Sequence, residues 1–132
     1  MQDEPNSAQL LAAVIRFLRD SAAPLLPPRE AFDARVAANA LELVQRDLAL
    51  GAESAAAEHD RLVALLGRDG SLAELNAALS AHLGEGGPDA VTPAIRDHLY
   101  ATTLEKLGID QPRYSAYLRT LEENAALAKT KT

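Results

Sequence analysis

Alanine and leucine dominate this chain, and this bias constrains the fold more than any other feature of the sequence. There are 27 Ala and 22 Leu among the 132 residues, against 14 Val, Ile and Thr together. Ala and Leu lose little conformational entropy in a helix, whereas the β-branched residues that suit pleated strands are scarce. The composition therefore predicts an all-α protein. A chain of this length is expected to form one domain, 1–132, with frayed tails at 1–5 and 128–132.

The charge balance and the missing cysteines exclude several classes of function. A net charge of −6 argues against a nucleic-acid partner, because phosphate binding needs a basic face. The absence of Cys excludes disulfides, thiolate metal sites and Cys nucleophiles. The start Met-Gln-Asp-Glu is acidic, unlike a signal peptide, and no apolar run approaches the roughly 20 residues of a membrane span. We therefore expect a cytoplasmic protein with no membrane association.

Apolar periodicity, glycines and prolines predict six helical segments. They are expected at 6–22, 28–50, 52–66, 71–84, 92–107 and 113–127. The glycines that should end four of them are Gly51, Gly67, Gly84 and Gly108. The expected N-terminal caps are Asn6 or Ser7, Ser71 in a capping box with Glu74, and Thr92 before Pro93. Because the connecting loops are short, we expect a compact bundle of five or six mostly antiparallel helices.

Residues that commonly carry catalysis are not arranged in a known pattern. The three histidines, His59, His82 and His98, belong to no His-Glu-x-x-His or Glu-x-x-His motif and are interpreted as boundary residues on helix flanks. The Gly-rich stretch 84–87 lacks the Lys-Ser/Thr pair of a phosphate loop and is interpreted as a turn. We predict no catalytic residue, no cofactor and no metal site. The sequence does not decide whether the protein is an enzyme, but it favours a protein without catalytic activity.

The segment 28–50 carries a polar stripe beside an apolar arc. The stripe is formed, at steps of four, three and four residues, by Arg35, Asn39, Glu42 and Arg46. The arc includes Phe32, Val36, Leu43 and Leu50 and is wide enough to contact helices on two sides. One interpretation is an internal polar network of Asp47, Arg46 and Lys106 that fixes helix register. The others are a binding surface containing Arg35 and Asn39, or plain exposure.

A second motif runs from Lys106 to Ser115 and combines a turn with Asp110, Arg113 and Tyr114. It is either a structural corner, in which Asp110 or Ser115 caps the last helix and Tyr114 buries its ring, or part of a binding surface. Polar groups at apolar edges need partners. We therefore hypothesise that Asp110 or Tyr114 contacts Arg35 or Asn39. The candidate binding residues are Arg35, Asn39, Asp110, Arg113 and Tyr114.

These two motifs also carry a family resemblance. The stretch from Phe32 to Leu41, above all Arg35-Val36-Ala37-Ala38-Asn39, resembles the signature of a family of small bacterial proteins of unknown function, as does the segment from Lys106 to Ser115. The resemblance covers about residues 1–117. It implies an all-helical protein encoded beside, or fused to, aminoglycoside-phosphotransferase-like kinases and acyl-CoA dehydrogenases. It assigns no chemistry to the shared residues.

The sequence thus favours a non-catalytic accessory module that binds a partner enzyme, a phosphotransferase-like kinase or an acyl-CoA dehydrogenase, through an exposed helical face. We also expect a homodimer, since amphipathic Ala/Leu helices pair by symmetric contacts. The alternative is a protein, or a minor enzyme, that binds an anionic small molecule in a pocket between helices, lined by Arg35, Asn39, Arg113 and Tyr114. A third possibility is a purely structural oligomer.

Overall fold

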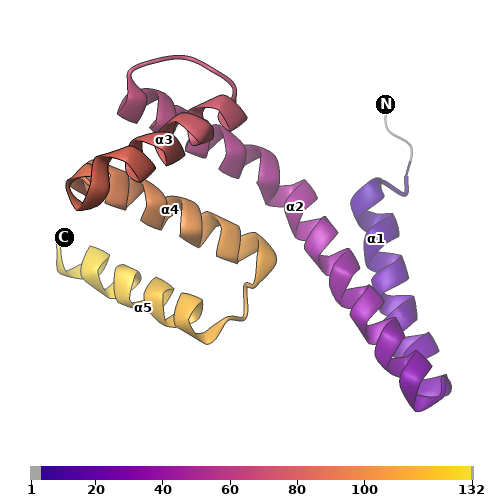
Figure 1. Ribbon diagram of the computed structural model, residues 1–132. Coiled ribbons are helices and arrows are strands. Elements are labelled where there is room, and N and C mark those ends of the chain that lie inside the picture. The colour runs from indigo at the N-terminus through magenta and orange to yellow at the C-terminus, as the bar shows by residue number, and fades with distance from the viewer. Residues whose placement is uncertain (1–3, 132) are drawn as a thin grey trace. The chain divides into compact units, whose positions relative to one another are not determined.

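The computed structural model describes residues 4–131, which form helices joined by short connections (Figure 1). The α-helices are α1 Ser7–Arg16, α2 Pro28–Leu66, α3 Leu72–Gly86, α4 Pro93–Asp110 and α5 Ser115–Thr130. Shorter helical turns are η1 Phe17–Ala22, η2 Ala23–Leu25 and η3 Gly87–Ala90. No strand occurs in this range, so the predicted all-α class is confirmed. The chain divides into two compact units, Met1–Leu50 and Gly51–Thr132, and a single-domain compact bundle stays a prediction.

Three predicted N-terminal caps are confirmed by their hydrogen bonds. The Asn6 side chain accepts from the Gln9 N–H, and the Gln9 side chain accepts from the Asn6 N–H. Ser71 and Glu74 form the predicted capping box, and the Ser71 N–H that donates to the Glu74 carboxylate lowers the pKa of Glu74. Thr92 accepts from the Ile95 N–H. Each cap satisfies backbone donors that the first helical turn leaves unpaired.

The helix end predicted at Gly51 is wrong, because α2 continues through it from Pro28 to Leu66. A glycine inside a helix costs only about 1 kcal/mol relative to Ala, and here good helix formers flank it with no proline after it. The division between the two units nevertheless falls at this residue. The end predicted at Gly84 is also early, since α3 reaches Gly86 and the positive φ of 62° belongs to Gly87. Likewise α4 passes Gly108 and ends at Asp110.

In the first unit, α1 lies along the first half of α2 (Figure 1). The buried side chains are small on α2, namely Ala31, Ala34 and Ala38, with Ile15 on α1. Small residues let two helix backbones approach closely, so this Ala stripe, rather than the apolar arc, makes the contact. The arc expected to face neighbouring helices is exposed instead, with Phe32 at 61% and Val36 at 47%.

In the second unit, a cluster of four large side chains holds three helices together. Leu62 of α2, Leu75 and Leu79 of α3, and Ile95 of α4 are all buried. α5 runs beside α4 in the opposite direction (Figure 1). Asn124 of α5 donates to the Tyr100 hydroxyl of α4 at 3.4 Å, and the Tyr117 hydroxyl approaches Gly108 closely. Full burial of such side chains contributes about 1.5–3 kcal/mol each.

The two glycines at the end of α3 should respond to alanine in opposite directions. A Cβ at Gly84 meets nothing within 4 Å inside the helix, so Gly84→Ala should raise the free energy of unfolding; the expected gain is about 0.5–1 kcal/mol. Gly87 has φ 62° and ψ −158°, a region that side chains avoid, so Gly87→Ala should lower the free energy of unfolding by about 1–3 kcal/mol. Urea denaturation of both variants tests this, and equal effects would contradict the placement of the helix end.

Candidate functional site

In the first unit, Arg19 of η1 joins the polar stripe of α2. Its guanidinium donates to the Glu42 carboxylate and to the Asn39 side-chain oxygen. The bond to Glu42 raises the pKa of Arg19 and keeps it charged. Glu42 and Asn39, two members of the predicted stripe, are therefore both bound by Arg19, a residue that the sequence did not indicate.

The other predicted residues of α2 lie around this junction. Arg35, Asn39 and Asp47 are exposed, and Arg46 is half-buried. An exposed Asp47 is solvated, so its position inside the apolar arc needs no buried partner. Whether Arg46 and Asp47 act as a structural network with Lys106, which is exposed on α4, stays a prediction.

In the second unit, a polar cluster lies beside the four-residue core. Arg61 of α2 donates to both carboxylate oxygens of Glu105 on α4, at 2.8 and 2.7 Å, and to the Thr102 hydroxyl at 3.1 Å. The paired bonds to Glu105 raise the pKa of Arg61. Asn76 of α3 donates to the buried Glu58 of α2 at 2.8 Å. A bidentate pair such as Arg61–Glu105 fixes geometry as well as adding energy, and it connects α2 with α4. The single bond from Asn76 to Glu58 connects α3 with α2.

His98 of α4 belongs to the same cluster and is 3% exposed, so its interpretation as a boundary residue is wrong. Burial lowers the pKa of His98, and the positive charge of Arg61 lowers it further, while Glu58 and Glu105 oppose the shift. Among the residues that the structure describes, His98 Nδ1 and Arg61 Nε are buried without a hydrogen-bond partner. The other two histidines differ from it, since His82 is exposed and the His59 ring bonds the Gly70 carbonyl at 2.9 Å.

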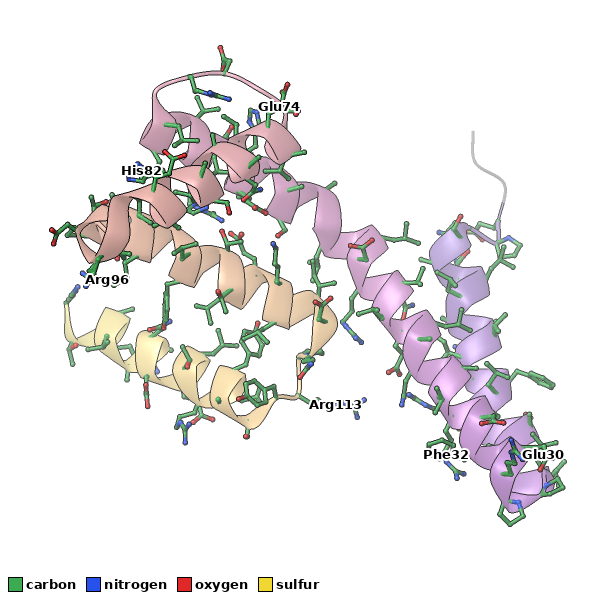
Figure 2. All side chains as sticks on the ribbon, viewed as in Figure 1. Glu30, Phe32, Glu74, His82, Arg96 and Arg113 are labelled. Carbon is green, nitrogen blue, oxygen red and sulfur yellow. The ribbon has the colours of Figure 1, made fainter. Side chains whose placement is uncertain are left out.

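The second predicted motif lies at the turn between α4 and α5 and faces outward. Lys106, Asp110, Arg113 and Tyr114 are all exposed, and Figure 2 shows Arg113 projecting from the turn. The expected cap is wrong: Tyr114 occupies the N-cap position of α5 without a side-chain bond, Asp110 ends α4, and Ser115 is already helical. The Tyr114 ring is 49% exposed rather than buried, and Tyr117, one turn later, packs toward Gly108 instead.

α5 also turns its apolar stripe outward. Tyr114, Leu118 and Leu121 are 49%, 44% and 41% exposed, and α5 has no buried residue. The side that meets α4 carries Tyr117 and Asn124. The stripe continues the exposed motif, so the turn and α5 form one outward surface, which we call the α5 face: Arg113, Tyr114, Leu118 and Leu121.

The candidate binding residues fall into two separate groups. Arg35 and Asn39 belong to the first unit, and Asp110, Arg113 and Tyr114 belong to the second. The hypothesis that the groups contact each other stays a prediction. A groove of about 540 Å³ lies within the first unit, between the start of α1 and Gln45, Leu48 and Ala49 of α2, and none of the candidate residues lines it.

Among residues 4–131, no group of three or more His, Cys, Asp or Glu side chains is placed to hold a metal ion. Within the same range, no helix has both the length and the apolar character needed to cross a bilayer.

These features define a small all-α protein whose polar motifs lie on exposed helical surfaces. The chain belongs to the family described as a domain of unknown function (DUF6285), whose model matches residues 24–114. The match contains the stretch from Phe32 to Leu41 and the second motif from Lys106 to Tyr114, without its last residue, Ser115. No curated protein and no solved structure matches the chain.

The sequence did not indicate a role for Arg19, Glu58, Arg61 or Glu105, and it placed His98 at a helix boundary rather than in the interior. Arg61 and Glu105 lie 44 residues apart, so no local spacing connects them. His98 follows Ile95, a buried residue, by one helical turn, and that spacing was the available sign that it lies on the inner side of α4.

The buried His98 predicts a loss of stability on acidification. The pKa of His98 is lowered from the ordinary 6.5. The stability that the neutral His98 contributes is therefore fully present above about pH 6.5, and it is lost as the pH falls through the pKa of His98 in the folded protein. One proton changes the free energy of unfolding by at most about 1.4 kcal/mol per pH unit. Urea unfolding between about pH 5 and 8 should show a flatter dependence for His98→Gln than for the wild type. The exposed-residue control, His82→Gln, should keep the wild-type slope, and equal slopes in the two variants would refute this role of His98.

Proposed function

We propose that the protein is a non-catalytic accessory module of the cytoplasm that works as a homodimer and binds a partner enzyme through the α5 face. The observation that carries this proposal is that α5 buries none of its side chains, while Tyr114, Leu118 and Leu121 stay outward. An isolated helix of this length is marginal in water. A partner that covers the stripe would supply the burial that α4 alone does not.

The composition of the α5 face supports a protein partner. Tyr and Arg are enriched among the residues that dominate binding energy at interfaces, and the face combines Tyr114 and Arg113 with two leucines. Tyr114 and Arg113 also lie within the matched part of the family. The family resemblance implies which enzymes to test first, a phosphotransferase-like kinase and an acyl-CoA dehydrogenase encoded nearby in bacteria.

The small-molecule alternative has less support. It needs Arg35 and Asn39 of the first unit to converge on one ligand with Arg113 and Tyr114 of the second unit, and no observation supports this convergence. The groove of the first unit is lined by other residues. The alternative stays a prediction with no observation that favours it.

Biolayer interferometry tests the α5 face: the full chain is immobilised, and the affinities of the purified kinase and of the purified dehydrogenase encoded nearby are measured. Leu118→Asp with Leu121→Asp should weaken binding at least tenfold, because loss of about 1.4 kcal/mol is tenfold in affinity and each buried Leu contributes more than that. Circular dichroism checks that the variant stays helical.

The matched control is Leu127→Asp, which changes a leucine of the same helix that is 60% exposed and lies off the stripe. It should bind as the wild type does. Binding of neither enzyme, or equal binding by the stripe variant, would contradict the proposal.

A further inference from the structure

The polar cluster of the second unit contains two buried nitrogen atoms whose hydrogen-bonding capacity is unused within residues 4–131. They are Nε of Arg61 on α2 and Nδ1 of His98 on α4. His98 as a whole is only 3% exposed. A buried polar atom without a partner costs stability, and in native proteins such atoms are bonded to protein groups or to ordered water. This pair therefore points to a further binding site.

The contacts of Arg61 direct its Nε toward the part of α4 that carries His98. Nη1 and Nη2 together hold Glu105, and Nη2 also donates to the Thr102 hydroxyl at 3.1 Å. Nη2 and Nε–H share one edge of the planar guanidinium, so Nε lies on the edge that meets Thr102. His98 precedes Thr102 by four residues, about one helical turn, and shares its face of α4. The two unused atoms therefore face the same region between α2 and α4.

The chemistry of the two atoms selects the ligand. Arg61 stays charged, so its Nε can only donate. The lowered pKa of His98 keeps the ring neutral at pH 7, and in the Nε2–H tautomer its Nδ1 accepts. A molecule between them must accept at one end and donate at the other, as water does. Ions fit worse, because Arg61 repels a cation, and the carboxylates of Glu58 and Glu105 repel an anion.

We propose that one internal water molecule joins Arg61 to His98, accepting from Nε–H and donating to Nδ1. Buried waters make about three hydrogen bonds, and the Thr102 hydroxyl, on the same edge of the guanidinium, is the third group of the site. The Arg61 side chain is 27% exposed, so solvent has a way in. The water connects α2 with α4 one turn before the Arg61–Glu105 pair, and the site is independent of the α5 face.

Nuclear magnetic resonance of the labelled full chain tests the site in solution. The carbon-bound ring protons of His98 should show cross-relaxation with a water that stays much longer than surface water does. The ring nitrogen shifts should report the Nε2–H tautomer with Nδ1 accepting. The ring of His82, which is exposed, serves as the internal control and should show no long-lived water. In a high-resolution crystal structure, the water should lie about 2.7–3.2 Å from both nitrogens.

Two substitutions of His98 separate the water from the mere size of the ring. His98→Asn keeps a polar atom at the δ position and should keep the water, whereas His98→Phe keeps a ring without nitrogen and should lose it. Oxygen-17 relaxation dispersion, which counts long-lived waters, should therefore fall by one in His98→Phe and stay at the wild-type count in His98→Asn and in the control His82→Phe.

Two results would overturn the proposal. One is a wild type in which Nδ1 of His98 bonds a protein group directly or shows no long-lived water. The other is a folded His98→Phe that keeps the wild-type count of long-lived waters. The wild-type measurements need no substitution, so they decide the question even if His98→Phe does not fold.

Discussion

The cluster of Leu62, Leu75, Leu79 and Ile95 is the contact on which the second unit depends, because these residues bring α2, α3 and α4 together in a chain whose other buried apolar residues are mostly alanines. Arg61 stands next to Leu62 and reaches Glu105, so the same turn of α2 supplies both the apolar and the charged connection to the neighbouring helices. Once α4 is fixed, Gly108 and Tyr100 offer the contacts on which α5 lies. The position of α5 therefore depends on the cluster around Leu62, which lies far earlier in the chain than Ser115, where α5 begins.

The same shortage of large buried side chains explains why apolar surface stays outside. In the first unit the contact between α1 and α2 uses Ala31, Ala34 and Ala38, which bring the helices close but bury little area each. The larger residues of α2, such as Phe32 and Val36, are left on the other side. In the second unit α5 repeats this division, with Tyr117 toward Gly108 of α4 and Leu118 left 44% exposed. Apolar surface that is free of the core is available to another protein, and this is the physical basis of the proposed accessory role.

Local features of this fold could be predicted from the sequence, and long-range ones could not. The caps at Asn6, Ser71 and Thr92 depend on residues within one helical turn and were identified correctly. The continuity of α2 through Gly51 was not, because a glycine costs a helix only about 1 kcal/mol and can therefore either end it or continue it. The pairing of Arg61 with Glu105 and the burial of His98 need the tertiary arrangement. Of the predicted motifs, Asn39 contacts Arg19, a partner that the sequence did not indicate. The structural-corner interpretation of the second motif, in which Tyr114 buries its ring, is wrong, since α5 meets α4 through Tyr117 and Asn124.

The central claim is that the α5 face is uncovered in the free protein and covered by its partner. Hydrogen–deuterium exchange of the full chain, alone and with the enzyme that binds it, measures this directly. The account predicts that amides of Ser115–Thr130 exchange much faster than those around Leu75 and Leu79 in the free chain, since a helix with no fully buried residue opens at low cost. They should then slow strongly in the complex. Exchange of α5 as slow as that of the α3 core in the free protein, or unchanged on enzyme binding, would contradict the claim.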